Sequence, residues 1–348
     1  MSYKRRRILV QLILTLFLLA VLLVGVSAQA PTALPLSEPG PFLVGTHQVV
    51  LTDASREDRR VVVKIWYPAS AATIDAAPLL DEAPYPVIVY SHGGGGSPSE
   101  NGTAEHLSSY GFVVIGVSHH DDISGVWVDR PMDIFLALDE MTRLNESGDF
   151  EGVADLAQLG LTGWSLGGAT TIQLAGARLD RAYHAAWCVD HANTPVCPRQ
   201  ALVDVGWNYM TSVGQFDENG LWYLPSEWQF DAAVTVNPGL SPIFGDKGLT
   251  TATIPILQLS GYLDQEALFQ EDQVFLFEHL GSADKSLITW IEVGHQLPAV
   301  PESMALQVKH FLVAFFGYHL QGREEYAEFL TEDYVNSIEG LHWGVYSE

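Results

Sequence analysis

The clearest chemical signal in the sequence is GWSLG at 163–167, with Ser165 at its centre. The apolar run at 159–162 before it has the character of a strand, and the small residues after it open a helical stretch. A tight strand-to-helix turn of this kind exposes a serine hydroxyl, and the flanking glycines relieve the crowding around it. The context therefore predicts that Ser165 is a nucleophile.

A serine hydroxyl becomes an effective nucleophile when a histidine takes its proton and an acid orients that histidine. In chains that use this turn, the acid and then the histidine follow the serine. His295 comes after the last expected strand, 287–293, and before the last expected core helix. We therefore expect His295 to be the base, whereas His310 and His319 lie within that helix and are better explained by packing or surface roles.

Two aspartates are candidates for the acid. Asp264 follows an expected strand at 254–259 through a short turn, beside the strand that delivers the histidine. Asp190 follows an expected strand at 185–189 and could reach the same imidazole from the neighbouring position. We favour Asp264 because little else explains an acid directly after that turn. Asp190 is the alternative acid, with a competing explanation as a neighbour of Cys188.

A glycine-rich turn at 93–96 follows Ser91-His92 and an expected strand at 86–90. Such a turn lets a backbone N–H approach a developing oxyanion without a side chain in the way. We expect the N–H groups of Gly94 and of Leu166, the residue after the nucleophile, to form the oxyanion hole. A phosphate-binding loop is the other common use of a glycine run, but no Gly-Lys-Ser/Thr follows here.

The run His119-His120-Asp121-Asp122 contains residue types that bind metals. Four adjacent residues on a strand cannot all point at one ion. A polar loop at a strand end near the active site explains them better, and we expect no metal.

The elements that must position these residues alternate along the chain. Nearly unbroken apolar runs predict buried parallel strands at 61–66, 86–90, 112–117, 159–162, 185–189, 254–259 and 287–293. The stretches between them carry apolar residues at helical spacing. This alternation favours an α/β fold with a doubly wound, mostly parallel sheet.

The stretch from about 198 to 250 breaks the alternation, with little clean periodicity and many aromatic side chains. It falls between the last-but-two and last-but-one expected strands, and a structureless loop of that length is uncommon in a compact domain. We therefore expect a cap insertion within a single domain that spans 31–348. Two or three of the aromatic residues at most should line a substrate pocket, and the others should pack the cap onto the body.

The first thirty residues are set apart from the fold. Four basic residues at 4–7 precede an apolar run at 8–26, and Ala28-Gln29-Ala30 has the small-x-small pattern of a signal-peptidase site. We expect 1–30 to be a signal peptide, with an uncleaved membrane anchor through 8–26 as the alternative. The protein should then be secreted or periplasmic.

Export also decides how the two cysteines are interpreted. Cys188 and Cys197 bracket a short loop. In an oxidising compartment this arrangement predicts one local disulfide rather than two unpaired thiols.

The composition indicates which kinds of partner and which classes of protein can be excluded. The chain has 348 residues, 42 Asp+Glu against 17 Lys+Arg, and a formal net charge of −25. Because there is no basic field to attract phosphate backbones, nucleic-acid binding is not expected. With 47% hydrophobic residues the chain can build a sizeable core, which excludes a disordered or collagen-like protein.

These motifs resemble the α/β-hydrolase superfamily, and within it the dienelactone-hydrolase-like group, which also contains platelet-activating-factor acetylhydrolases and bacterial polyester hydrolases. The resemblance runs from about 44 to 316. Besides the Ser165 turn it rests on IWYP at 65–68, SHGG at 91–94, RPMD at 130–133, GYLD at 261–264 and Gly294-His295. It implies hydrolysis of carboxylic esters through an acyl-enzyme, with no cofactor.

The sequence departs from parts of this group. The dienelactone hydrolases proper use a cysteine where this chain has Ser165, which argues against lactone ring-opening. The acetylhydrolases look similar around Asp190, which keeps that acid as a candidate, and the long cap is unlike the compact polyester hydrolases.

The sequence therefore predicts an exported serine esterase or lipase that acts on a small-molecule or lipid ester. The alternatives are a phospholipase that resembles the platelet-activating-factor acetylhydrolases, and a non-catalytic adhesion or binding module on the same fold. We favour an enzyme because all the expected catalytic positions are filled.

Overall fold

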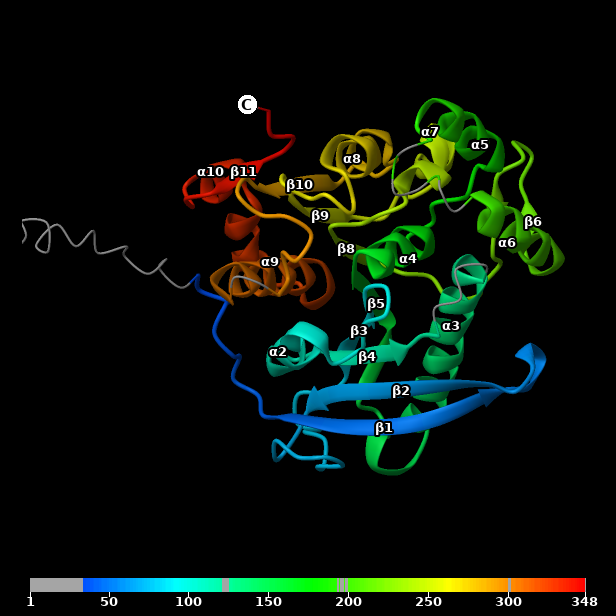
Figure 1. The fold of residues 1–348 in the computed structure, drawn as a ribbon. Helices are drawn as coiled ribbons and strands as arrows, with labels where there is room; N and C mark the ends of the chain where they lie inside the picture. The colour runs from blue at the N-terminus through cyan, green and yellow to red at the C-terminus, as the bar shows by residue number, and fades with distance from the viewer. Residues whose placement is uncertain are drawn as a thin grey trace, which may run out of the picture. The chain divides into compact units, whose positions relative to one another are not determined.

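The structure of the protein, a computed structural model, describes residues 34–120, 125–192, 194, 197, 200–299 and 302–347, and for 200–205 it describes the backbone alone (Figure 1). The predicted signal peptide or anchor at 1–30, and Asp121 and Asp122, lie outside the described residues. No helix in the described part of the chain is long and apolar enough to cross a membrane.

A large sheet forms the centre of the fold, and within the described ranges it has nine strands in the order β1-β2-β4-β3-β5-β8-β9-β10-β11. Neighbours from β4 to β10 pair in parallel, and the strands at the two edges pair antiparallel. The strands are β1 (Val44–Asp53), β2 (Arg59–Pro68), β3 (Tyr85–Ser91), β4 (Val113–Ser118), β5 (Ala154–Trp164), β8 (Ala232–Val236), β9 (Ile256–Gly261), β10 (Lys285–Trp290) and β11 (Leu341–Trp343).

The sequence of each strand matches its place in the sheet. Every residue of β8 and β9 is buried, as expected for parallel strands covered on both faces. The edge strand β1 alternates instead between half-buried and exposed residues along most of its length. The doubly wound, mostly parallel sheet predicted from the apolar runs is confirmed.

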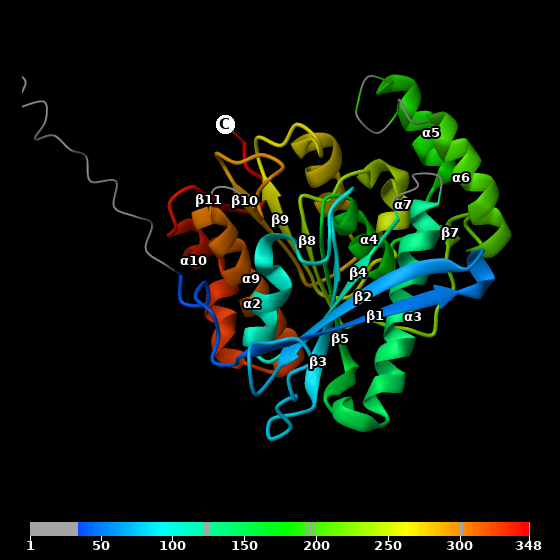
Figure 2. The ribbon, with the colours of Figure 1, turned by 60° about the horizontal axis from the view of Figure 1, so that its bottom comes forward.

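Helices cover both faces of the sheet (Figure 2). On one face lie α2 (Thr103–Ser109), α9 (Glu302–Gln321) and α10 (Glu332–Asn336); on the other lie α3 (Val126–Asn145), α4 (Leu166–Leu174), α7 (Gly245–Leu249) and α8 (Phe275–His279). The short 3-10 helices are η1 (Ala54–Arg56), η2 (Glu100–Gly102), η3 (Gly148–Phe150), η5 (Ser241–Ile243) and η7 (Glu324–Leu330), and η6 (Phe269–Val274) is a π-helix.

One predicted strand is wrong, and its correction moves the insertion. Residues 185–189 lie within α5 (Arg181–Asp190), whose first turn is capped by the Asp180 side chain, which accepts a hydrogen bond from the Tyr183 N–H. On the side of β5 away from β3, the neighbouring strand is β8, which lies inside the stretch 198–250 that was expected to form the cap.

The observed insertion precedes β8 and so comes one strand earlier than predicted. Between α4 and β8 the chain forms α5, α6 (Gln200–Val213) and a hairpin of β6 (Gln215–Phe216) and β7 (Trp222–Tyr223). In Figures 1 and 2, α6 lies beside α3 at the edge of the molecule. Trp207 and Trp222 are fully buried and anchor this insertion on the body.

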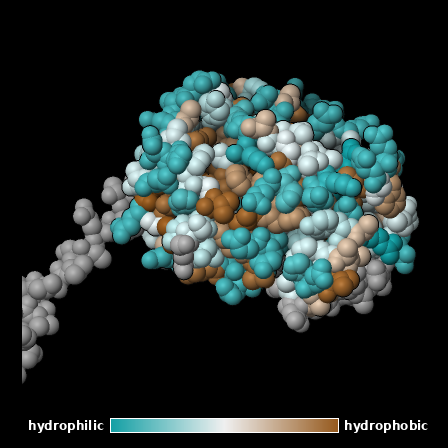
Figure 3. Space-filling model, turned by 90° about the horizontal axis from the view of Figure 1, so that it is seen from above, coloured by the Kyte–Doolittle hydropathy of each residue, from teal (hydrophilic) through white to brown (hydrophobic). Residues whose placement is uncertain are grey.

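The surface of the described residues is largely hydrophilic. On the face in Figure 3, hydrophilic residues are spread widely and hydrophobic residues lie scattered among them. The chain as a whole carries a formal net charge of −25, which disfavours the attraction of polyanions.

Candidate active site

Ser165 lies in the tight turn between β5 and α4, with φ 56° and ψ −118°. A positive φ is strained for a residue with a side chain and is typical of functional positions. The glycines of the motif allow this turn to approach β3. A Cβ atom on Gly167 would overlap the Ser91 carbonyl oxygen, and one on Gly163 would overlap the Gly167 carbonyl oxygen.

The structure brings Ser165, His295 and Asp264 together from three loops. His295 Nε2 lies 2.8 Å from Ser165 Oγ, and His295 Nδ1 lies 2.8 Å from Asp264 Oδ2. Because an ionised carboxylate only accepts hydrogen bonds, the imidazole proton belongs on Nδ1, which leaves Nε2 free to accept from the serine hydroxyl. This is the geometry in which a histidine can take the serine proton.

Both carboxylate oxygens of Asp264 have hydrogen-bond partners. Asp264 is 2% exposed, and its Oδ1 accepts the backbone N–H groups of Glu266 and Ala267 while Oδ2 faces the imidazole. The alternative acid, Asp190, is exposed as the last residue of α5 and does not follow a strand. The structure therefore places Asp264, and not Asp190, on His295.

A buried asparagine that the sequence analysis missed holds the histidine loop. Asn237 directly follows β8, and its Nδ2 donates to the carbonyl oxygens of Gly294 and His295 at 3.0 Å each. Its Oδ1 accepts the Gly261 N–H at 2.7 Å. The signal for this residue is a polar side chain and a proline directly after an apolar strand, but 232–236 was not recognised as a strand.

The two expected oxyanion donors lie beside each other. A Cβ atom on Gly94 would be 3.8 Å from Leu166 Cδ2, and both residues line the same cavity as Ser165. Leu166 is the first residue of α4, so its N–H has no partner within the helix and lies at the positive end of the helix dipole. Among the described residues, the Gly94 N–H has no hydrogen-bond acceptor.

His92 holds the glycine-rich turn from behind. Its Nε2 accepts the backbone N–H of His119 at 3.0 Å, so the ring proton belongs on Nδ1. Nδ1 therefore donates to the Gly93 carbonyl oxygen, which is 2.6 Å away. The Gly93 N–H donates in turn to Glu100 Oε1 at 3.0 Å. His92 and Glu100 are thus further residues that organise the turn.

The cavity in front of Ser165 has a volume of about 640 Å³. Apolar side chains form its walls and polar side chains lie at its rim; the walls include Trp164, Leu166, Leu240 and Ala267, and the rim includes Gln265, Glu266 and Gln296. Glu266 is 69% exposed, and its Oε2 lies 3.9 Å from His295 Nε2.

None of the aromatic residues in the described part of 198–250 lines this cavity. Within the described part of 198–250, Leu240 reaches it together with Gly239. Tyr223, Trp228 and Phe230 instead line a separate cleft against α3 and α4. This agrees with the expected upper limit of two or three pocket residues, and most of the aromatic residues of the stretch pack in the core instead.

A buried carboxyl connects two walls of the cavity. Asp272 Oδ1 accepts the Ser241 N–H, next to Leu240, and Oδ2 accepts the Leu268 N–H, next to Ala267. Burial raises the pKa of Asp272 to about 7. The ionisation of this carboxyl thus occurs near neutral pH, beside the loops that shape the cavity.

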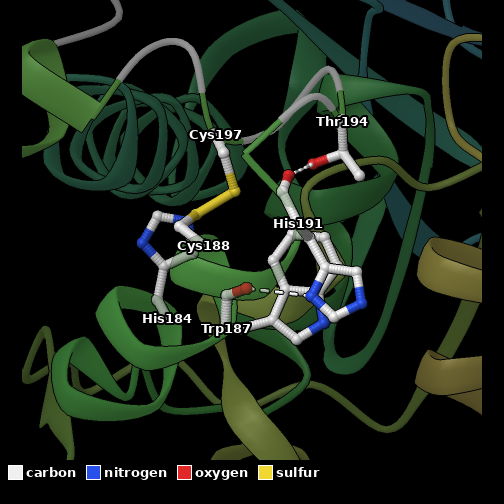
Figure 4. Close-up of a disulfide and its surroundings, with 6 residues drawn as sticks. All are labelled: His184, Trp187, Cys188, His191, Thr194 and Cys197. Atoms are coloured by element: carbon white, nitrogen blue, oxygen red, sulfur yellow. Dashed lines mark hydrogen bonds between the residues drawn. A yellow bond between two sulfur atoms is a disulfide. The ribbon is translucent and has the colours of Figure 1, made fainter.

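The predicted disulfide between Cys188 and Cys197 is present (Figure 4). The indole of Trp187 stacks on the His191 ring at 4.1 Å, and His184 Nε2 lies 3.6 Å from Cys188 Sγ. Leu240 packs against the disulfide, so the bridge contacts a wall of the Ser165 cavity. A disulfide of this kind is typical of proteins outside the reducing cytoplasm.

The expected polar loop at 119–122 is described only in part. His119 is buried, and its Nδ1 lies 3.1 Å from Asp133 Oδ2, whereas His120 is exposed. In the part of the chain that the structure describes, no cluster of three or more His, Cys, Asp or Glu side chains is arranged to hold a metal ion.

The sheet order, the Ser165 turn and the helices on both faces define an α/β-hydrolase fold. Residues 69–128 match the family model of platelet-activating factor acetylhydrolase, isoform II. The fold is thus that of the α/β-hydrolases, and over this segment the chain is similar to the platelet-activating factor acetylhydrolase family, which supports an esterase- or phospholipase-type hydrolase. The matched segment includes Gly94 but ends before Ser165. No curated protein matches the chain.

Proposed function

We propose that the protein is a serine carboxylic-ester hydrolase, with Ser165 as nucleophile, His295 as general base and Asp264 as the acid that orients the imidazole. The observation that carries this proposal is the continuous chain of two 2.8 Å contacts from Asp264 through His295 to Ser165. The strained serine backbone and the cavity in front of it add support.

The reaction follows from the geometry. Ser165 Oγ attacks the ester carbonyl carbon as its proton passes to His295 Nε2, and the carbonyl oxygen becomes an oxyanion that accepts the Gly94 and Leu166 N–H groups. Collapse of this intermediate breaks the bond to the alcohol, which leaves with the proton from His295. Water then loses a proton to His295 and attacks the acyl-enzyme. As the second intermediate collapses, His295 returns this proton to Ser165 Oγ, and the carboxylic acid product is released.

We also propose that the protein is exported and that its substrate is an ester with an apolar part. The disulfide supports a protein exported through a signal peptide at 1–30, because such bridges persist outside the reducing cytoplasm. Apolar walls suit the acyl or alcohol part of a small-molecule or lipid ester. The family match favours a second candidate within the same chemistry, a phospholipase that removes a short acyl group from a lipid.

Hydrolysis of p-nitrophenyl esters from acetyl to palmitoyl by the purified protein tests this function. We expect turnover that Ser165→Ala abolishes. A preference for short acyl chains would favour an esterase, and efficient release of acetate from an acetylated phospholipid would favour the phospholipase. Equal turnover by the wild type and Ser165→Ala would show that Ser165 is not the nucleophile, and no turnover of any ester would favour a non-catalytic binding module.

A further inference from the structure

Arg130 carries a buried positive charge directly behind the glycine-rich turn. It lies on α3, is 1% exposed and is among the largest fully buried side chains. Its Nη1 donates to the His92 carbonyl oxygen at 2.7 Å and to Ser91 Oγ at 3.2 Å, and its Nη2 lies 3.4 Å from the Gly93 carbonyl oxygen. Because a guanidinium is costly to bury, these contacts point to a specific use of the charge.

The carbonyl that Arg130 reaches belongs to the same peptide group as the Gly94 N–H. A trans peptide is planar, and its C=O and N–H point in opposite directions. The Gly93 oxygen faces Arg130 and His92, so the Gly94 N–H faces away from them. Gly93, Gly94 and Gly95 line the same cavity as Ser165, and we infer that the Gly94 N–H faces into it.

Four consecutive glycines give this turn little conformational preference of its own, because glycine adopts many backbone conformations at similar energy. The Gly93 oxygen also accepts His92 Nδ1 at 2.6 Å and the Gly96 N–H at 3.1 Å, so Arg130 acts together with these two donors. The rigid, planar guanidinium of Arg130 binds two neighbouring carbonyl oxygens, and this restricts rotation of the Gly93–Gly94 peptide. A hydrogen bond from a cation to the carbonyl also polarises the peptide, which makes its N–H a stronger donor.

We propose that Arg130 is a positioning residue of the oxyanion hole, which orients and polarises the Gly93–Gly94 peptide so that the Gly94 N–H binds the oxyanion. This inference rests on the proposed function, because it assigns Arg130 a role in the same ester hydrolysis. Arg130 does not touch the substrate in this account and acts through the backbone.

Arg130→Met and Arg130→Lys test the proposal, with Arg143→Met as the matched control. Arg143 lies on the same helix, but its side chain is 65% exposed and pairs with Glu140. Active sites are counted by titration with a fluorophosphonate, so that misfolded protein does not lower the measured kcat. Kinetics with p-nitrophenyl acetate are combined with inhibition by an alkylboronic acid, whose tetrahedral adduct with serine mimics the oxyanion.

For Arg130→Met we expect kcat per titrated site to fall on the order of 10²-fold, as for loss of one oxyanion donor. KM should stay within about threefold, because the interaction is made in the transition state, and boronate affinity should fall with kcat. Arg130→Lys should lose at least about tenfold, because a single ammonium cannot replace the two-pronged guanidinium. Arg143→Met should match the wild type.

Unchanged kcat per titrated site in Arg130→Met would show that Arg130 only packs the core. If that variant does not fold, a wild-type kcat and boronate affinity in Arg130→Lys would overturn the proposal in the same way. A rise in KM at constant kcat would assign Arg130 to substrate binding instead. A wild-type protein that neither reacts with the fluorophosphonate nor hydrolyses esters would overturn the proposed function itself, and this inference with it.

Discussion

Replacing Asp264 with asparagine separates the two candidate acids, and the structure determines which way the new amide must face. Asp264 Oδ1 accepts two backbone N–H groups, from Glu266 and Ala267. The asparagine oxygen must take this place, because an NH₂ group there would leave both buried donors unpaired, at a cost of roughly 1–3 kcal/mol each. The NH₂ group therefore faces His295 Nδ1.

A donor at that position changes the tautomer of the imidazole. Nδ1 must then accept, so the proton moves to Nε2, which faces Ser165 Oγ and can no longer take the serine proton. The same substitution in a serine protease triad lowers kcat on the order of 10⁴-fold. We expect a loss of this size for Asp264→Asn, which corresponds to about 5.4 kcal/mol of transition-state stabilisation.

The assay compares Asp264→Asn with Asp190→Asn by kcat and KM on p-nitrophenyl acetate, with circular dichroism to show that both variants fold. Asp190 is exposed at the end of α5, so its variant should retain wild-type kcat within about twofold, as surface changes usually do. Two results would show that Asp264 does not orient His295 as proposed: a larger loss of kcat in Asp190→Asn than in Asp264→Asn, or an Asp264→Asn variant with more than about a tenth of the wild-type kcat.

Three further predictions concern stability. Asn237→Ala removes the hydrogen-bond partners of three backbone groups, so it should lower the free energy of unfolding by on the order of 3 kcal/mol and reduce kcat. An unchanged midpoint of urea unfolding would contradict the role of this side chain. Replacing both cysteines by serine opens a bridge with a sequence separation of 9, for which the chain-entropy model gives about 2.6 kcal/mol. Because Leu240 packs on that bridge, KM should also rise, and an unchanged KM would show that the contact does not shape the cavity. Burial lowers the pKa values of His106 and His119 to about 4, so the unfolded chain, with pKa values near 6.5, binds more protons between those limits. Asp272, with its pKa raised to about 7, acts in the opposite sense, but the two histidines together outweigh it. Stability should therefore fall as the pH drops from 6.5 toward 4, and a Tm that does not fall across this window would contradict this balance.

The side chains that the sequence analysis proposed for the triad lie together in the structure, and they could be proposed because each signal is local. The glycines at 163 and 167 are needed for the serine turn itself, and Asp264 and His295 each follow an apolar strand directly. Motifs that sit at strand ends can be found in this way, because parallel strands deliver their carboxyl ends to one edge of the sheet.

One error came from an overlooked local signal, and the other from a segment whose structure depends on distant contacts. The run 185–189 is apolar enough for a strand, but the Asp180 cap makes it a helix. The five residues of β8 are recognisable as a strand mainly through their pairing with β5 and β9. Once β8 was missed, Asn237 at its end was missed as well.

The contacts of Arg130 also could not be predicted from the sequence. Its motif was part of the family resemblance, but its acceptors lie 37 to 39 residues earlier in the chain. No periodicity or spacing predicts such a contact, because the fold must first bring α3 against the end of β3.

The most direct test of the central claim is mass spectrometry of the protein after reaction with a fluorophosphonate. We predict one probe per chain, attached to Ser165, and no labelling in Ser165→Ala or after denaturation of the wild type. Attachment to a different residue, or labelling that survives in Ser165→Ala, would contradict the assignment of Ser165 as the nucleophile.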